Sequence, residues 1–307
     1  MLKRCWCILL LSVASPLFGQ QATETNPLAP SIELSDAPPV DGDTVERAAQ
    51  RSRSITDHAG TVEYFVRRLH PYEPIYFVAG TERPSGKFQF SLRYQIFQGP
   101  DVPDGVFAPL AGLSFAYSQT SLWDLEAPSK PFVDNSYRPE AMLHYDDLIN
   151  PKRLRVISRL GLQAGYQHES NGLNELESRS VNYLYVRPII TFGSRDEGSG
   201  FIMVAPRLHA YVGGLAENPD IKKYRGYGDL RLIVGQGGGL QAAFTGRLGS
   251  DLRKGSIQLD LTYPLSRLIR GSADVYLTAQ VFNGYGEGMI AYDENDTTLR
   301  LGVSLIR

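Results

Sequence analysis

The sequence is short of cysteine, of net charge and of long hydrophobic runs. Its 307 residues include only two cysteines, and the formal net charge at pH 7 is −2. So small a charge does not suit a protein dedicated to binding nucleic acid. The mean hydropathy of −0.21 argues against a bundle of transmembrane helices. Composition alone therefore suggests a soluble globular chain, but high counts of glycine (30) and tyrosine (17) disturb that interpretation.

Both cysteines, Cys5 and Cys7, lie in a segment built like a secretory signal peptide. Two basic residues precede an apolar run that ends at Ala14, and small or turn-forming residues follow it. The run is shorter than the ~20 residues that a membrane-spanning helix needs. Residues 1–20 are therefore predicted to be a signal peptide, with a buried N-terminal helix as the alternative. The mature chain would then contain no cysteine and no disulfide.

The next segment has the composition of a loosely attached extension. Residues 21–60 are rich in proline, serine, threonine, aspartate and glutamate and have few aromatic residues. Segments of this kind bury too little apolar surface to offset the entropy lost on ordering. Residues 21–70 are therefore predicted to be a polar, flexible N-terminal extension, and residues 71–307 are predicted to form the folded domain.

Strict alternation of apolar and polar residues begins near residue 72. Over Lys87–Ile96, for example, five apolar residues alternate with five polar residues, and Ala273–Val281 repeats the pattern. A period of two predicts strands with one apolar and one polar face. About twelve such segments are expected, starting near residues 73, 87, 109, 136, 153, 178, 200, 226, 238, 254, 272 and 297.

A transmembrane barrel accounts for this pattern better than a soluble sandwich. An even number of strands of about ten residues, a signal peptide and aromatic residues near strand ends are typical of outer-membrane barrels. The polar faces carry many charges, such as Arg153, Arg155 and Arg159 on one strand, which would fill the lumen. The chain is therefore predicted to be all-β, a 12-stranded antiparallel transmembrane β-barrel. A soluble β-sandwich or a periplasmic barrel is the alternative.

Three polar side chains break the alternation on the apolar face of two neighbouring strands. Over residues 154–166 the even positions are mostly apolar, and His168 and Ser170 share that parity. On the next strand, Asn182 shares its parity with the apolar residues that follow it. If the intervening hairpin is centred on Glu175, His168 lies directly opposite Asn182, where Cβ atoms are about 4.5–5.5 Å apart.

These residue types in this arrangement suit nucleophilic catalysis. A serine beside an imidazole, with a third group that holds the imidazole in one tautomer, is the pattern of a catalytic triad. An asparagine carboxamide can orient a histidine without placing a charge beside lipid. The alternative is a polar rim, formed where the strands leave the membrane. The sequence contains no cluster of cysteine and histidine residues of the kind that binds a transition metal.

The segment around His168, YQHESNGLNELESRSVNYLY, resembles the outer membrane phospholipase A family. The signature of that family is His-x-Ser-Asn-Gly followed by Ser-Arg-Ser-x-Asn. Four further segments resemble the family in the same order, namely SLWDL, SYRPE, ENPDIKKYRGY and NGYGEGMIAYD. The resemblance covers roughly residues 70–305. It implies a twelve-stranded outer-membrane barrel with its active site on the outside surface.

The resemblance implies catalytic roles for three residues of the signature. Ser170 is implied to be the nucleophile that attacks an ester carbonyl of a phospholipid, His168 the general base, and Asn182 the residue that orients it. A backbone N–H near Gly172 would meet the oxyanion. The implied activity is that of a calcium-dependent phospholipase A1/A2 of the bacterial outer membrane, which also hydrolyses lysophospholipids.

The resemblance also implies a calcium cofactor and a homodimer as the active form. The positions that match the calcium ligands of the family are Ser129, Leu173, Ser178 and Glu217. Leu173 stands where the family often has arginine, but this ligand acts through its backbone carbonyl. Glu217 stands where aspartate is common, and both side chains offer hard oxygen donors to Ca²⁺. Ordinary loop polarity is the alternative for all four residues.

A non-enzymatic barrel, either a channel or a structural protein, is the alternative function. A lumen of twelve strands is narrow, and the side chains expected to line it are arginine, glutamine and tyrosine, which argues against wide passive transport. No nucleic-acid partner is expected. The place of His168, Ser170 and Asn182 separates the two functions, because an outer-surface site requires all three at one rim, outside the lumen.

Overall fold

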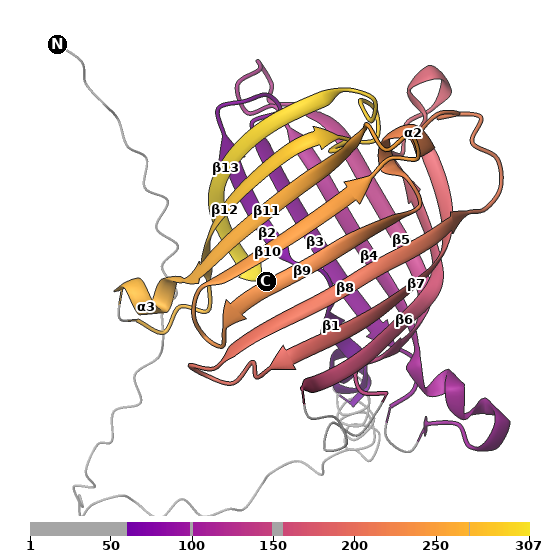
Figure 1. Ribbon diagram of the computed structural model, residues 1–307, viewed down its shortest axis with the longest axis vertical. Helices are drawn as coiled ribbons and strands as arrows, with labels where there is room; N and C mark the ends of the chain where they lie inside the picture. The colour runs from indigo at the N-terminus through magenta and orange to yellow at the C-terminus, as the bar shows by residue number, and fades with distance from the viewer. Residues whose placement is uncertain (1–59, 99–100, 149–155, 270) are drawn as a thin grey trace, which may run out of the picture. The chain divides into compact units, whose positions relative to one another are not determined.

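The described part of the chain forms one antiparallel sheet that closes on itself (Figure 1). The predicted signal peptide, residues 1–20, and residues 21–59 of the predicted extension lie outside the described residues. The computed structural model of the chain describes residues 60–98, 101–148, 156–269 and 271–307.

Neighbouring strands pair antiparallel around the barrel. The strands are β1 (Leu69–Pro71), β2 (Ile75–Gly80), β3 (Gly86–Gln95), β4 (Leu113–Trp123), β5 (Phe132–Tyr145), β6 (Ile157–Ser170), β7 (Ser180–Gly193), β8 (Gly200–Tyr211), β9 (Gly228–Gln236), β10 (Gln241–Leu248), β11 (Gly255–Pro264), β12 (Tyr276–Tyr285) and β13 (Asn295–Ile306). β13 pairs with β2 and closes the barrel. β1 and β2 both pair with β3, so they act as one strand interrupted at residues 72–74. The predicted 12-stranded antiparallel barrel is confirmed.

Helical turns replace the expected pattern at a few places. The strand expected near residue 109 begins only at Leu113, because the 3-10 helix η2 (Gly105–Gly112) precedes it. Residues 60–68 are helical and lead directly into β1. Three further short helical segments lie between strands, namely η4 (Glu175–Glu177), α2 (Lys222–Arg225) and α3 (Leu265–Ile269). Among the described residues, no helix is long and apolar enough to cross a membrane.

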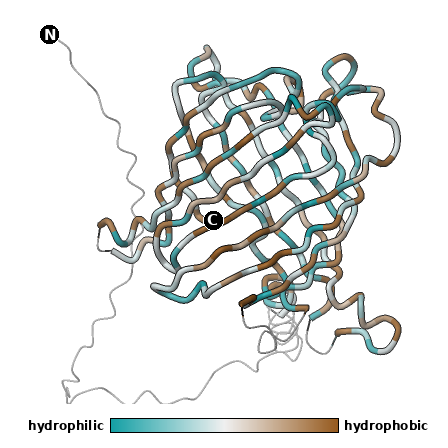
Figure 2. The backbone as a smooth tube through the Cα atoms, in the orientation of Figure 1, coloured by the Kyte–Doolittle hydropathy of each residue, from teal (hydrophilic) through white to brown (hydrophobic). Residues whose placement is uncertain are grey.

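Each strand presents one face to the lumen and one to the outside. On β6, Gln163, Gln167 and Glu169 are buried, whereas Tyr166 between them is 42% exposed. Figure 2 shows hydrophobic and hydrophilic positions mixed along the strands in the same way. Alternation therefore sends the apolar side chains outward and the polar ones inward, which is the arrangement that a barrel in a bilayer requires.

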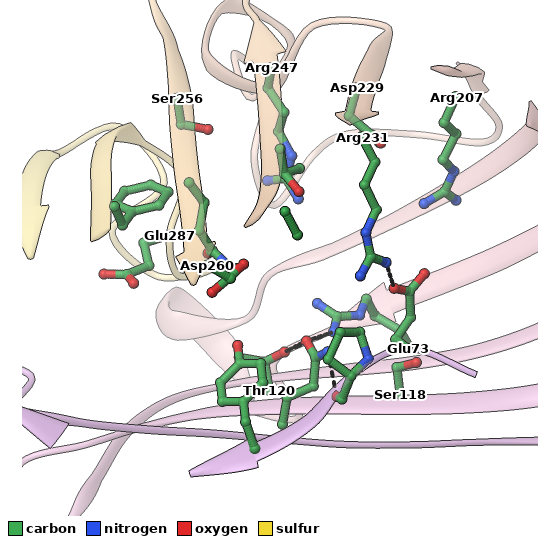
Figure 3. Close-up of a pocket in the computed structure, with 18 of the residues that line it drawn as sticks. Glu73, Ser118, Thr120, Arg207, Asp229, Arg231, Arg247, Ser256, Asp260 and Glu287 are labelled. Atoms are coloured by element: carbon green, nitrogen blue, oxygen red, sulfur yellow. Dashed lines mark hydrogen bonds and ion pairs between the residues drawn. The ribbon is translucent and has the colours of Figure 1, made fainter. Parts of the chain in front are cut away.

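Charged side chains line a pocket inside the barrel (Figure 3). Glu73, in the interruption between β1 and β2, lies 3.0 Å from Arg187 and also pairs with Arg231. Arg207, on β8, and other charged side chains line a cavity of about 210 Å³. A carboxylate is stable in such an interior only when it is paired. The pairs of Glu73 therefore tie the first strand to β7 and β9 across the lumen.

The two ends of the barrel differ in their connections. The site end is the one where β6 finishes at Ser170 and β7 begins at Ser180. There an apolar cluster, drawn from β7 and from the connections after β8 and β12, packs inside the barrel. Its buried members are Val181, Tyr183, Ile221, Tyr224, Met289 and Tyr292. The opposite end, where β13 finishes at Ile306, is called the terminal end below.

Candidate active site

β6 and β7 place His168 and Asn182 side by side on the outer face of the barrel. The register pairs His168 directly with Asn182, as a hairpin centred on Glu175 predicts. Nδ1 of His168 lies 2.8 Å from Oδ1 of Asn182. Both side chains are partly exposed and share their face with the exposed Leu184. The pair therefore lies outside the lumen, where a site that acts on membrane lipid would have to be.

Asn182 determines which nitrogen of His168 carries the proton. An amide oxygen only accepts hydrogen bonds, so Nδ1–H of His168 donates to Oδ1 of Asn182. The phenol of Tyr166 donates to the same oxygen at 2.6 Å. The neutral imidazole then has its lone pair on Nε2, which is the form that a general base requires. Tyr166 belongs to the apolar series of β6 in the sequence, so alternation alone did not reveal its polar contact.

Ser170 lies two residues beyond His168 on the same face of β6. It is opposite Ser180 on β7 and Tyr137 on β5. Its side chain makes no hydrogen bond within the described part of the chain, His168 included. Residues at this spacing are about 6.4–6.8 Å apart along a strand, and catalytic hydrogen bonds are often long without substrate. The structure thus joins His168 to Asn182 and leaves Ser170 next to them.

The loop that follows Ser170 is organised by Asn171, a buried residue with an exposed fraction of 2%. Its Nδ2 donates to the carbonyl of Glu177 at 2.7 Å. Its Oδ1 accepts from the N–H of Arg179 at 3.0 Å and from that of Leu173 at 3.3 Å. One side chain therefore closes the connection between β6 and β7. The only sequence signal for this role is its place beside Ser170 in the family signature.

Gly172 occupies a turn that other residues fit poorly. Its φ is +73°, in the left-handed region that favours glycine. A Cβ atom here would also lie 2.8 Å from the ring of Tyr137. Glycine thus lets the backbone turn sharply directly after the strand that carries Ser170, at the position from which a backbone N–H is expected to meet the oxyanion.

The four residues implied as calcium ligands lie on three connections of the site end. Leu173 and Ser178 share the loop closed by Asn171, Ser129 lies between β4 and β5, and Glu217 lies between β8 and β9. Their donors are a backbone carbonyl, hydroxyls and a carboxylate, which are the oxygen ligands that Ca²⁺ prefers. The residues present therefore fit calcium.

The structure brings these four residues only partly together. No hydrogen bond or ion pair between described residues joins Ser129 or Glu217 to Leu173 or Ser178. Glu217 is nevertheless fixed near β7, because its neighbour Asn218 accepts a hydrogen bond from the N–H of Ser180 at 3.1 Å. Within the described ranges, no group of three or more histidine, cysteine, aspartate or glutamate side chains could hold a metal ion.

Glu169 anchors the site strand from the inside of the barrel. It stands between His168 and Ser170 in the sequence but points into the lumen. Its carboxylate accepts from the hydroxyl of Ser136 at 2.7 Å and from Arg225 at 3.1 Å. Arg225, on α2, also donates to the carbonyl of Gly288 at 2.9 Å. These bonds fasten β5, β6 and two connections directly behind the outer-face residues.

A second buried carboxylate, Glu287, braces the same end. It lies between β12 and β13, 3.1 Å from Nζ of Lys87 and 3.2 Å from Nη2 of Arg300. Burial alone would raise the pKa of Glu287, but the positive charges of Lys87 and Arg300 outweigh burial and hold the pKa below its ordinary value. The carboxylate is therefore ionised at neutral pH and holds the connection in place.

Fold and site together define a class of protein. A closed barrel with an apolar outer surface is an outer-membrane protein, and this one carries a hydrogen-bonded His168–Asn182 pair on its outer face. The profile of the family described as Phospholipase A1 matches residues 68–305. The chain belongs to this family and is an outer-membrane phospholipase, so the non-enzymatic alternative is set aside.

Known proteins resemble the chain over most of its length. Phospholipase A1 of Escherichia coli K12 is 27% identical over 320 residues, which cover 98% of this chain and 96% of the relative. Phospholipase A1 of Salmonella typhimurium LT2 is 31% identical over 221 residues, covering 71% and 68%.

Solved structures agree with the fold. Outer membrane phospholipase A from Escherichia coli matches with a TM-score of 0.64 and 28% identity, covering 77% of this chain and 91% of that chain. The Salmonella typhi outer membrane phospholipase dimer with bound calcium matches with a TM-score of 0.63 and 26% identity, covering 77% and 92%. The family resemblance expected from the sequence is confirmed.

Proposed function

We propose that this outer-membrane phospholipase is a serine esterase in which Ser170, His168 and Asn182 form the catalytic triad. The observation that carries the proposal is the 2.8 Å hydrogen bond between His168 and Asn182 on the lipid-facing side of the barrel. A related structure from Escherichia coli is of an active-site mutant in which alanine replaces an asparagine. The substrates are phospholipids and lysophospholipids, whose ester groups lie at the level of a barrel rim.

Acylation begins when Oγ of Ser170 attacks the carbonyl carbon of the ester. As the new C–O bond forms, the hydroxyl proton passes to Nε2 of His168, and Asn182 stabilises the resulting imidazolium through Nδ1–H. The oxyanion of the tetrahedral intermediate accepts a hydrogen bond from a backbone N–H at Gly172. The bond to the glycerol oxygen then breaks, and His168 gives the proton to that leaving oxygen.

Deacylation repeats the same proton transfers with water. Nε2 of His168 takes a proton from a water molecule, whose oxygen attacks the acyl carbon bound to Ser170. The bond to Oγ breaks, the fatty acid leaves, and His168 returns the proton to Oγ. Because proton uptake and release alternate at one nitrogen, the Nδ1–H tautomer that Asn182 holds is needed in both halves of the reaction.

Calcium binding is the second part of the proposal. Ser178 and the carbonyl of Leu173 would hold the ion, with Ser129 and Glu217 as further oxygen ligands. When bound, calcium supplies positive charge where the ester oxygen becomes negative. The closed loop around Asn171 supports this assignment, because it fixes the backbone between the first two ligands. The related Salmonella typhi protein is a dimer with bound calcium, and we propose a homodimer as the active form here.

Fatty-acid release from mixed phospholipid–detergent micelles tests the proposal. We expect release by the wild type with calcium, and loss of release on chelation and in Ser170→Ala. Ser180→Ala is the matched control, because Ser180 lies directly opposite Ser170 on the neighbouring strand, and it should keep its activity. Equal release by the wild type, the chelated enzyme and Ser170→Ala would overturn the proposed mechanism.

A further inference from the structure

The connections at the terminal end of the barrel expose large apolar side chains. In η2, Val106 is 86% exposed and Phe107 is 62% exposed. In α3, which stands out from the wall of the barrel in Figure 1, Leu268 and Ile269 are also exposed. Connections that face water are usually polar, and an apolar surface of this kind marks a site of interaction.

The helix of residues 60–68 carries three apolar side chains on one face. Val62, Phe65 and Val66 recur at the spacing of one helical face, and all three are exposed. Glu63 and Arg67, which form an exposed ion pair, lie on a different face. A helix with an apolar and a charged face is suited to lie at the boundary between lipid and water.

The apolar face of this helix continues the lipid-facing surface of the barrel. The ring of Phe65 stacks on that of Tyr94, with 5.2 Å between centroids. Tyr94 belongs to the outer face of β3, because its neighbour Arg93 is buried in the lumen. Across the sheet it pairs with Phe115, an exposed aromatic residue on the outer face of β4. The helix is therefore placed where the lipid-facing band ends.

η2 is fixed at the end of β5, on the same side of the barrel as the helix. η2 contains no charged residue, and the next charged residue along the chain is Asp124. The phenol of Tyr145, at the end of β5, donates to the carbonyl of Pro109. At the entrance to this connection, Asp101 pairs with Arg68, the last residue of the helix. The helix and η2 are thus held by the ends of β3 and β5.

We propose that these segments insert into the phospholipid leaflet around the terminal end. The segments are the helix of residues 60–68 and η2. The exposed apolar side chains that they contribute are called the apolar collar, namely Val62, Phe65, Val66, Val106 and Phe107. Lipid is the occupant because the contact of Phe65 with Tyr94 joins the helix to the surface that already faces lipid. Val106 and Phe107 belong to a connection that Tyr145 fixes at the same end of the barrel. Insertion at this end would set the depth of the barrel in the membrane, and with it the height of the site at the other end.

Spin labels on single cysteines test the collar in liposomes. A nitroxide is placed at Val62 or Phe107, with Arg67 as the matched position on the charged face of the same helix. Leu301, on the outer face of β13, is the lipid-exposed reference. Cys5 and Cys7 are replaced by alanine in all variants. Collisions with oxygen, which is concentrated in hydrocarbon, are compared with collisions with a water-soluble nickel chelate.

We expect oxygen to dominate at Val62 and Phe107, as at Leu301, and the nickel chelate to dominate at Arg67. Phospholipase activity of each labelled variant shows that the barrel is folded. Water-dominated collisions at Val62 and Phe107 would overturn the proposal, because the collar would then lie outside the leaflet. Shielding of both labels from both reagents would overturn it as well, because protein and not lipid would cover the collar.

Discussion

Replacing Asn182 by alanine isolates its contribution to catalysis. The variant removes the oxygen that accepts from Nδ1 of His168 at 2.8 Å and from Tyr166 at 2.6 Å. Ser170 and the backbone pairing of β6 with β7 remain. His168 keeps its capacity to accept a proton, but the imidazole loses the partner that selects its tautomer and stabilises its charged form.

The size of the effect follows from the bond that is lost. In the transition state His168 becomes an imidazolium, so its bond to Asn182 is a hydrogen bond to a charged group, which contributes about 1.5–3 kcal/mol. With about 1.4 kcal/mol for each factor of ten, kcat should fall roughly 10- to 100-fold. KM should change little, because the amide does not contact the acyl chain in this mechanism.

Steady-state release of fatty acid at saturating calcium measures both constants. Asn283→Ala is the matched control, since it removes an exposed amide from the outer face of β12 at the same end of the barrel and should leave kcat unchanged. Unchanged kcat in Asn182→Ala would refute the role of Asn182. A loss as complete as that of Ser170→Ala would also refute it, because orientation alone does not abolish the chemistry.

Three further predictions concern other residues at the site end of the barrel. Tyr166→Phe removes one of the two hydrogen bonds at Oδ1 of Asn182, so kcat should fall by only about two- to fivefold. In an Asn182→Ala background the same substitution should lower kcat much less, and a double-mutant cycle measures the difference. Asn171→Ala removes the hydrogen bonds that close the loop carrying Leu173 and Ser178, so half-maximal activity should require at least several-fold more calcium. An unchanged calcium requirement would contradict the assignment of Leu173 and Ser178 as calcium ligands. Glu287 has a lowered pKa in the folded state, so its contribution to stability is present above its ordinary unfolded pKa of about 4.3 and is lost as pH falls through the folded value. Glu287→Gln should therefore have a lower melting temperature than the wild type at pH 7, and the difference in melting temperature should shrink as the pH falls below about 4. A difference in melting temperature that does not depend on pH would contradict the pairing of Glu287 with Lys87 and Arg300.

The alternation of residues was sufficient to predict the barrel and the face on which His168 and Asn182 lie. His168 and Asn182 pair as expected, because side-chain direction and strand register depend only on residue parity and hairpin length. The same pattern does not predict where each strand begins and ends. η2 begins with apolar residues that resemble a strand, yet a 3-10 helix forms there and β4 starts at Leu113.

The alternation of apolar and polar residues does not predict the hydrogen bonds of individual side chains. Tyr166 has the parity of lipid-facing residues, and only its position next to Asn182 reveals the hydrogen bond of its hydroxyl. Asn171 is one polar residue among several in a loop, and its role depends on three backbone groups that the fold brings around it. The calcium assignment stays a prediction, because loops on separate strands contribute its ligands.

Covalent trapping of Ser170 tests the central claim most directly. A fluorophosphonate with an alkyl chain reacts when an activated serine oxygen displaces fluoride from phosphorus, and peptide mass spectrometry then locates the adduct. We predict one adduct per chain, on Ser170, in the presence of calcium, and strong loss of labelling in His168→Ala. Labelling at another residue, or labelling of Ser170 that does not depend on His168, would contradict the proposed triad.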